Sequence, residues 1–477
     1  MSSHVLQQTP PRKKYILASV AVGAFLSTFD GGVVNVGLPK MAAEFRVSIS
    51  MIQWVPSVYL LTMSALLIIF GTLADMYGRK HIYNGGYAVV AVFSILCALT
   101  NNISLLILTR MLQGVGGAMI MANGLAIATE NYPPEQRGKN IGTLASVAAI
   151  GSLAGPSLGG IVIGLWGWRW IFILNCLVAA LGFTVSHLII PADRGKGKGK
   201  AKKFDAWGSL YVIVGMVSFI YAISNLNDFG WSSPIILISL ALFLLSVLAV
   251  AIQERRAENP VLDFELFKVR IFWTSIIAAL ISFITMYSST ILIPFYYQKV
   301  LGYSPQAAGL FMMAFPLGMA VMAVFAGRLS DKIGYALLTT GGMVLNALAL
   351  ILLAHVGLRT PLVQVLLAVF GMGASLGLFQ APNNSCIMGN VPKNKLGIAT
   401  GISQLVKNLG MVLGITLSVA VFQYGMRART GLAYSDAFAP SAATVYYLAA
   451  GLSIVGAFFS LNRGHSKPLP IVNGKKA

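Results

Sequence analysis

The chain predicts an all-α membrane protein of about 14 transmembrane helices, and three observations carry this prediction. The first is composition: 57% of the 477 residues are hydrophobic, only 10% are charged, and the mean hydropathy is +0.77. A soluble protein of this length needs far more charge to cover its surface. The second is periodicity, because apolar runs of about 18–25 residues, each able to cross roughly 30 Å of hydrocarbon, follow one another almost end to end.

The third observation is a charged turn with glycines that occurs twice. Gly71–Lys80 reads GTLADMYGRK, and Gly327–Gly334 reads GRLSDKIG. One copy follows the second apolar run and the other follows the tenth, so the two copies are eight runs apart. We therefore predict two six-helix bundles, with the nearly nonpolar hairpin 207–252 inserted between them.

The prediction divides the sequence into seven parts in chain order. These are a cytoplasmic tail (1–14), the N-terminal six-helix bundle (15–192), a basic cytoplasmic linker (193–206), the inserted hairpin (207–252), a cytoplasmic loop (253–270), the C-terminal six-helix bundle (271–462) and a cytoplasmic tail (463–477). No loop is long enough to form a soluble domain.

The formal net charge of +20 is distributed unequally between the two sides of the predicted membrane. About 25 Lys and Arg fall in loops on the side of the N-terminus and about 7 on the other side, which places both termini in the cytoplasm. The basic loops are therefore topology determinants first, and an anionic-lipid surface second. They do not imply nucleic acid.

Catalytic and metal-binding patterns are missing from the sequence. Cys97, Cys176 and Cys386 all lie inside apolar runs with no close spacing, so neither a disulfide framework nor a metal site is expected. No nucleophile triad and no phosphate-binding loop occurs in a plausible context. We expect no enzyme activity, no metal and no cofactor.

Two ionisable residues lie deep in the predicted N-terminal bundle. Asp30 is roughly 22 Å from the cytoplasmic start of the first run, and Arg110 in the fourth run is roughly 20 Å from the same face. Ionisable groups at this depth are costly unless they are paired or hydrated, so both are expected to face the bundle interior. Asp30 is predicted to carry a proton, with Arg110 tuning its acidity. A static, structural ion pair is the alternative.

A substrate cavity is predicted from one further charge, amides and aromatic rings. Lys407 is about 16 Å into its run, where it contacts substrate or only snorkels along a polar seam. Amide side chains in hydrocarbon need hydrogen-bond partners, and Pro382 leaves a nearby backbone carbonyl without its usual donor. The predicted lining residues are Phe25, Phe29, Tyr59, Gln113, Tyr287, Phe311, Phe315, Gln380, Asn383, Asn384 and Lys407. For the single Phe residues, simple packing or lipid contact is the competing interpretation.

Two other stretches have a structural interpretation of their own. In the first charged turn, the Asp75 carboxylate can accept hydrogen bonds from helix N-terminal amides or pair with Arg137. Gly78 allows the tight turn. In the fifth run, glycines four residues apart share one helix face and let a neighbouring backbone approach, while a proline bends the helix. The residues of this face are Gly151, Gly155, Pro156, Gly159 and Gly160.

Five motifs, in order along nearly the whole chain, resemble those of the major facilitator superfamily. They are Gly71–Lys80, Arg110-x-x-Gln113-Gly114-x-Gly116, the Gly151–Gly160 stretch, and two motifs similar to those of fourteen-span drug:proton antiporters, Asp30–Pro39 and Trp168–Phe172. The second charged turn departs from the pattern, with Tyr335 and Ala336 after Gly334. The second half also has no carboxylate deep in a run, which puts a preference for cationic drugs in doubt.

The resemblance implies a monomeric, proton-coupled exporter of lipophilic drugs in the plasma membrane, whose two bundles rock around a central substrate site. The proton is the coupling ion, and the partners are a small-molecule substrate, protons and the lipid bilayer. The resemblance also implies a cytoplasmic conformational latch made of Asp75, Gly78, Arg79, Arg137 and Asp331, and an antiporter role for the glycine-rich fifth run. Two alternatives stay open: a proton-coupled uptake symporter for a specific metabolite, and a non-transporting membrane sensor.

Overall fold

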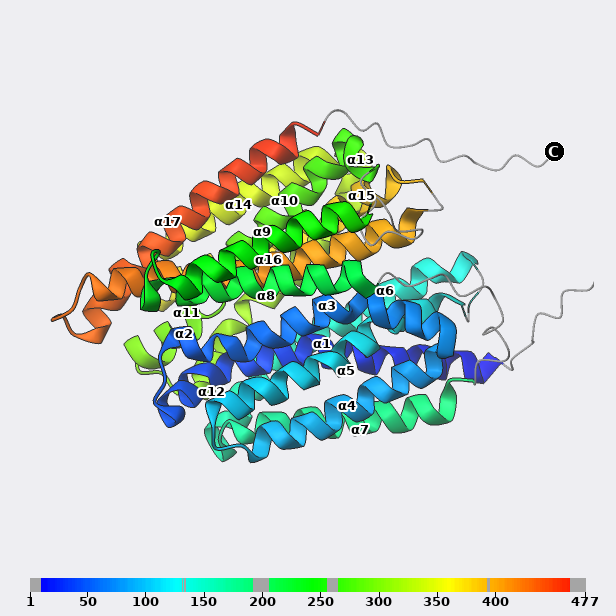
Figure 1. Cartoon of the computed structure of the whole chain (residues 1–477), viewed down its shortest axis with the longest axis horizontal. Helices are drawn as coiled ribbons and strands as arrows, with labels where there is room; N and C mark the ends of the chain where they lie inside the picture. Colours follow the sequence, from blue (N-terminus) through cyan, green and yellow to red (C-terminus); the bar gives the residue numbers. More distant parts are fainter. Residues whose placement is uncertain are drawn as a thin grey trace, which may run out of the picture. The chain divides into compact units, whose positions relative to one another are not determined.

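The computed structural model describes residues 10–130, 132, 134–191, 206–254, 265–392 and 395–463, which form helices joined by short turns, with no strand among them (Figure 1). Thirteen of the described helical segments are long and apolar enough to cross a membrane, and α8 contains a shorter apolar stretch, Leu210–Leu226. The predicted all-α membrane fold is therefore confirmed. The total of 14 spans and the inserted hairpin stay predictions.

The chain divides into two compact units. Unit 1 comprises Met1–Val217, Leu242–Asn259 and Tyr303–Leu310, and unit 2 comprises Ser218–Ala241, Pro260–Gly302 and Phe311–Ala477. Three helices, α8 (Ala206–Phe229), α9 (Pro234–Glu254) and α12 (Pro305–Met312), contribute residues to both units.

In unit 1, α1 lies against α6 and α7, while α5 lies between α3 and α4, and α4 also contacts α7. The helices are α1 (Pro10–Phe45), α2 (Ile49–Ile52), α3 (Trp54–Tyr77), α4 (Arg79–Leu99), α5 (Ile103–Glu130), α6 (Pro134–Trp166) and α7 (Arg169–Ile189). The short α2 begins at Ser48, whose side chain accepts a hydrogen bond from the Met51 amide and so satisfies one of the free donors at the helix start.

Unit 2 repeats this order of neighbours: α10 lies against α16 and α17, α15 lies between α13 and α14, and α14 contacts α17. The helices are α10 (Arg270–Tyr287), α11 (Leu292–Phe295), α13 (Ala314–Ile333), α14 (Tyr335–Ala354), α15 (Leu362–Gly389), α16 (Leu396–Arg427) and α17 (Tyr434–Leu461), with a 3₁₀ turn at Leu266–Lys268 and a π turn at Tyr296–Val300. Because the pairs correspond, we match α1 with α10, α4 with α14, α5 with α15 and α7 with α17.

Glycines allow the closest helix contacts in both units. On α6, a Cβ at Gly155 would lie 2.9 Å from the Phe29 carbonyl oxygen of α1. On α16, a Cβ at Gly410 would lie 2.9 Å from the Leu280 carbonyl oxygen of α10. Only glycine permits backbones to approach this closely, so the same small-residue contact joins the matched helix pairs.

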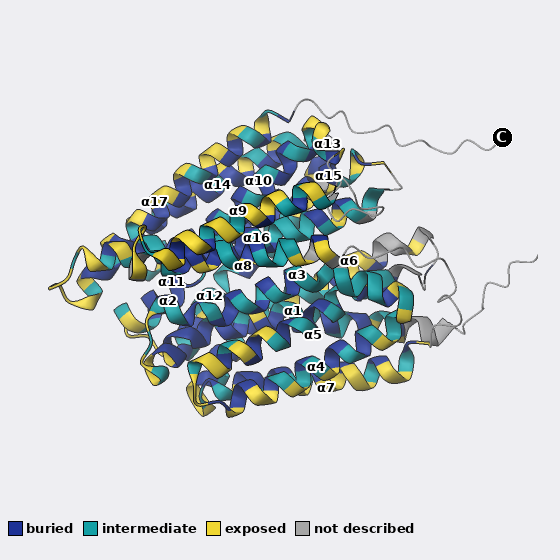
Figure 2. Ribbon diagram, in the orientation of Figure 1, coloured by how far each residue is buried: buried dark blue, intermediate teal, exposed yellow. Residues whose placement is uncertain are grey.

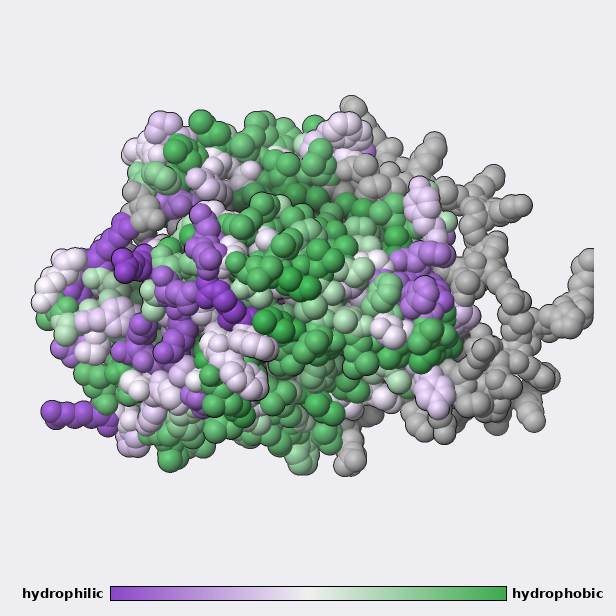
Figure 3. Space-filling view, turned by 90° about the horizontal axis from the view of Figure 1, so that it is seen from below, coloured by the Kyte–Doolittle hydropathy of each residue, from purple (hydrophilic) through white to green (hydrophobic). Residues whose placement is uncertain are grey.

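The helices bury one side and expose the other, and the exposed side chains include many large apolar ones (Figure 2). Figure 3 shows a broad hydrophobic area over the middle of the visible face, with hydrophilic side chains toward both ends and the larger group at the left. An apolar outer surface is what a lipid bilayer requires, because hydrocarbon offers no partners to polar groups.

Candidate functional site

The interior of unit 1 contains a two-pronged ion pair between α1 and α5. Arg110 Nη1 donates to Asp30 Oδ1 at 3.0 Å, and Arg110 Nη2 donates to Asp30 Oδ2, also at 3.0 Å. Asp30 is only 3% exposed and Arg110 only 1%. The parallel geometry is the strongest that an arginine and a carboxylate can form, and it compensates two charges that would otherwise be very costly inside a membrane.

Neighbouring helices complete the hydrogen bonding of this ion pair. Asn175 of α7 donates to Asp30 Oδ1 at 2.5 Å, and Arg110 Nη1 also donates to Gln113 Oε1 at 2.6 Å. The amide of Gln113 donates in turn to Ser94 Oγ of α4 at 2.7 Å. Four helices therefore share one buried network, which we call the Asp30 network: Asp30, Ser94, Arg110, Gln113 and Asn175.

A backbone carbonyl and two aromatic rings also contact the Arg110 guanidinium. Arg110 Nε donates to the Val55 carbonyl oxygen at 3.3 Å, at the start of α3. The Tyr59 ring lies 4.4 Å from Arg110 Cζ and the Phe172 ring 5.8 Å from it. An aromatic face attracts a cation, most strongly where water is excluded, so these two rings fix the orientation of the guanidinium.

The Asp30 carboxylate accepts three hydrogen bonds, two from Arg110 and one from Asn175. Because these donors belong to α5 and α7, the carboxylate of α1 holds three helices together. Loss of any of these hydrogen bonds would weaken the contact between α1 and its neighbours.

The structure brings together the predicted residues Asp30, Arg110, Gln113 and Tyr59, and adds two that the sequence interpretation missed. Asn175 is the only amide of α7, and Ser94 lies in α4. The signal for Asn175 was available, because an amide in a membrane-spanning helix needs a partner. The signal for Ser94 was not, since a serine can return its hydroxyl to its own helix backbone.

The other predicted cavity residues of unit 1 lie on α1. The Phe25 and Phe29 rings are stacked, with centroids 5.3 Å apart, and Phe29 is buried directly before Asp30.

In unit 2 the predicted cavity residues are spread over several helices. Lys407 Nζ lies 5.8 Å from the centroid of the Phe283 ring, and Phe311 packs against Tyr297. Asn383 is buried and Asn384 is exposed, as expected for neighbours on a helix. The remaining three are half-buried: Tyr287, Phe315 and Gln380.

The predicted latch is described only in part. Asp75 and Arg79 form an ion pair of 2.9 Å within the first turn, with the Asp75 side chain 65% exposed. Gly78 has φ +98°, which explains why glycine is required there. The side chains of Arg137 and Asp331 lie outside the described residues, so a contact with Asp75 stays a prediction.

The glycine-rich face of α6 meets two helices. A Cβ at Gly151 would lie 2.7 Å from the Phe25 carbonyl oxygen, and one at Gly159 would lie 3.0 Å from Val33 Cα, so both positions face α1. Gly32 of α1 packs against Pro156 from the other side. Gly160 faces the start of α12 instead, where a Cβ would lie 3.1 Å from Gly309 Cα.

A second polar cluster lies at the C-terminal end of α1, around Glu44. Arg169 pairs with Glu44 and donates to the Asn101 side chain at 2.7 Å, and Trp168 Nε1 donates to Glu44 at 2.7 Å. The Arg169 guanidinium stacks over the Trp168 ring at 4.4 Å. These contacts fasten α1 and α7 together and give the Trp168–Phe172 motif a structural role.

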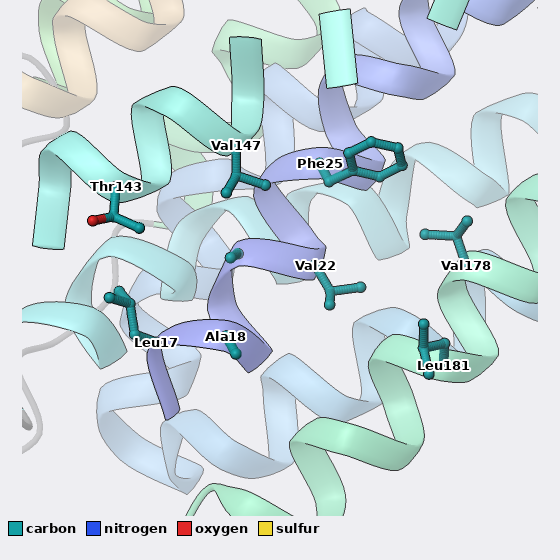
Figure 4. A pocket seen from close by; sticks show the side chains of 9 residues that line it. Leu17, Ala18, Val22, Phe25, Thr143, Val147, Val178 and Leu181 are labelled. Carbon is teal, nitrogen blue, oxygen red and sulfur yellow. The ribbon is translucent and has the colours of Figure 1, made fainter. Parts of the chain in front are cut away.

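An apolar groove separates α1, α6 and α7 on one side of unit 1 (Figure 4). It encloses about 520 Å³ and is lined by Leu17, Ala18, Ala21, Val22, Phe25, Thr143, Val147, Val178 and Leu181. Phe25 is the one predicted cavity residue in this lining, and Thr143 supplies its one hydroxyl. The groove contains no charged side chain and is separate from the Asp30 network.

Comparison with known families gives one match that covers most of the chain. Residues 20–415 match the model of the Major Facilitator Superfamily.

Two relatives illustrate the range of named substrates. The riboflavin transporter RibZ of Clostridioides difficile (strain 630) is 31% identical over 449 residues, which are 93% of this chain and 96% of that protein. The multidrug transporter protein MdtP of Bacillus subtilis (strain 168) is 29% identical over 432 residues, 90% of this chain and 78% of that protein.

Solved structures agree at the level of the fold. The POT family transporter PepTSo aligns with a TM-score of 0.70 at 16% identity, covering 95% of this chain and 98% of that one. At this identity the likeness concerns the fold alone.

Proposed function

The chain belongs to the Major Facilitator Superfamily, and is thus a membrane transporter and not an enzyme; from this premise we propose that it exports lipophilic drugs or related small organic compounds in exchange for protons. The proposal places it among the fourteen-span drug:proton antiporters. Relatives named as multidrug transporters support the substrate class.

The observation that carries the proton coupling is the buried ion pair between Asp30 and Arg110. A carboxylate at this depth is retained in a membrane protein where it performs a task, because its burial is costly. In our proposal a proton binds Asp30 on one side of the membrane, Arg110 turns toward Gln113, and α1 is freed from α5. Deprotonation on the other side restores the ion pair.

Other parts of the protein contribute to the proposed transport cycle. The glycine contacts between α1 and α6 let the two helices slide with little steric hindrance, because no side chain separates their backbones. The first charged turn acts as the latch on the cytoplasmic side. No cofactor other than the proton is needed, and a monomer in the plasma membrane with both termini in the cytoplasm suffices.

Charge favours neutral, zwitterionic or anionic substrates. With Asp30 ionised, the central charges Asp30, Arg110 and Lys407 sum to net positive, which disfavours a dication. A second candidate substrate, riboflavin or a similar planar vitamin, is favoured by the relative RibZ, which matches this chain over nearly its whole length.

Proton movement in liposomes tests the proposal. The purified protein is reconstituted with a pH-sensitive dye inside, no gradient is imposed, and a lipophilic dye or riboflavin is added. We expect substrate-dependent proton movement in the wild type and none in Asp30→Asn, which keeps the shape of the side chain but cannot ionise. The sign of the movement separates antiport from uptake by symport.

Glu44→Gln is the matched control, because Glu44 is the other carboxylate of α1 and lies outside the Asp30 network. Its proton movement should follow the wild type. If Asp30→Asn moved protons as the wild type does, Asp30 would be only structural. If no compound moved protons in the wild type although ligands bound, a facilitator or a non-transporting sensor would be the better description.

A further inference from the structure

Arg463 is a buried cation at the end of unit 2 where α17 stops. It follows α17 by two residues and is 2% exposed, which places it among the most buried large side chains of the described chain. Arginines near helix ends in membranes usually extend outward to water. Arg463 instead turns inward, since its Cζ lies 5.9 Å from the centre of the Phe379 ring on α15.

The guanidinium lies beside the Cys386 thiol, a weak hydrogen-bonding group, and has no carboxylate partner among the described residues. Its Nε, Nη1 and Nη2 atoms are buried and make no hydrogen bond of ordinary length and angle there. Burial lowers the pKa of Arg463 to about 10, while the neighbouring Cys386 thiol raises it, so the side chain stays charged at neutral pH. Arg110, the other fully buried arginine described, pairs with a carboxylate, whereas Arg463 has no carboxylate partner in the described part of the chain.

A second unpaired polar atom lies on the same face of α15. Phe379, Asn383 and Cys386 follow one another at helical spacing, so their side chains share one side of the helix. Asn383 is 1% exposed, and its Oδ1 is also buried without a partner. An amide can present its NH₂ group instead of its oxygen to a ligand, because the two orientations are nearly isosteric.

Hydroxyl groups lie at the same level of the bundle. Ser460, one turn before Arg463, pairs with Thr339 at 2.7 Å and accepts from Thr340 at 3.1 Å, both near the start of α14. Ser275 of α10 donates to Cys386 Sγ at 3.8 Å. Polar side chains of α10, α14, α15 and α17 are therefore linked near this end of unit 2, with Cys386 in contact with Arg463 itself.

We propose that Arg463 and Asn383 form a binding site for a phosphate group, enclosed by α10, α14, α15 and α17 at the predicted cytoplasmic end of unit 2. Water alone would satisfy the N–H groups but leave the buried charge uncompensated, whereas an oxyanion does both. The fork of a guanidinium matches two oxygens of a phosphate. The phosphate comes from a soluble ester or from an anionic lipid headgroup, since the site lies near the membrane surface.

Thermal unfolding of the full-length protein in lipid-free detergent tests the site, with inorganic phosphate added at constant ionic strength. At phosphate well above its Kd, the Tm of the wild type should rise by about 2–4 °C. Arg463→Met should show no rise, and it is expected to fold because an apolar side chain of similar length replaces an unpaired charge. Arg270→Ala, which removes an exposed cation at the start of α10, should respond as the wild type does.

One further variant and one lipid comparison test the site and the source of the phosphate. Asn383→Asp places a carboxylate beside Arg463, so its Tm should be higher without phosphate and should no longer respond to it. Phosphatidylglycerol in the micelles identifies a lipid source if it raises the Tm and abolishes the phosphate response, whereas phosphatidylcholine does neither. An equal phosphate response in Arg463→Met, or no response of the wild type to either probe, would overturn the proposal.

Discussion

In unit 1 the interior polar groups of α1, α4, α5 and α7 meet at the Asp30–Arg110 ion pair, whereas in unit 2 the matched helices meet at a neutral amide. Asn346 of α14 donates to Thr285 of α10 at 2.9 Å and to Ser453 of α17 at 3.2 Å, and accepts from Ser375 of α15 at 3.4 Å. The order of helix contacts is the same in the two units, so the difference is in the side chains alone.

The comparison separates two tasks that a polar interior can perform. A neutral amide among hydroxyls fixes the positions of four helices and has no charge to gain or lose between pH 5 and 8. A buried ion pair also fixes helices, but its stability depends on keeping both charges. Both networks hold four helices together, and under the proposed function only the network of unit 1 would also carry the proton.

Removing one charge of the ion pair should have the largest effect. Arg110→Met leaves Asp30 buried without a counter-ion, and we expect a loss of about 3–5 kcal/mol in folding stability, with transport abolished. The measurement is thermal unfolding in detergent micelles.

The double variant Asp30→Asn/Arg110→Met serves as its control, because it removes both charges together. It should recover much of the lost stability while transport stays absent. If the single and double variants were equally unstable, the loss of folding stability would come from lost side-chain contacts. The uncompensated charge of Asp30 would then not be its cause.

Disrupting the neutral network should have a smaller effect and a different signature. Asn346→Leu removes the amide donor to the hydroxyls of Thr285 and Ser453, which keep only their bonds to backbone carbonyls. We expect a loss of about 1–3 kcal/mol in stability. Substrate-driven proton movement per molecule transported should be unchanged. A changed proton stoichiometry in the liposome assay would contradict the division of tasks between the units.

The charged turns should give the smallest effect on stability. Asp75→Asn breaks an exposed pair with Arg79, so we expect at most about 1 kcal/mol of lost stability. Transport should nevertheless slow, because the latch contributes to one conformational state only. The turn of unit 2 has Tyr335 at the place of Arg79, so Tyr335→Phe is the matched control. Equal transport rates for wild type and Asp75→Asn would remove the latch from the proposal.

Much of the unit 1 site could be predicted because a charge in hydrocarbon is so restrictive. Asp30 and Arg110 lie at similar depths in two runs, and the cost of leaving either alone made their pairing the simplest expectation. Gln113 was predicted to line the substrate cavity, whereas the structure shows it accepting a hydrogen bond from Arg110. Asn346 was overlooked, since a neutral amide carries a weaker penalty and several unrelated hydroxyls could have satisfied it.

The burial of Arg463, by contrast, could not be predicted from the sequence. Its place in the sequence, just after the last apolar run, assigned it to the cytoplasmic tail together with 464–477. An arginine there normally extends to water, and no sequence pattern distinguishes one that turns inward. Its burial depends on how α15 packs near the end of α17, which brings together Phe379 and Arg463, 84 positions apart.

The sequence by itself determined that this chain spans a membrane many times, that it is built twice, and which buried charges need partners. Those conclusions rest on local properties: run length, repeated turns and the cost of charge in lipid. The tertiary structure decided which groups meet, so that Asn175 completes the Asp30 network, Asn346 binds hydroxyls of three other helices of unit 2, and Arg463 is buried without a carboxylate partner among the described residues. Such contacts depend on the rotation and register of each helix, which neighbouring helices set and no single run encodes.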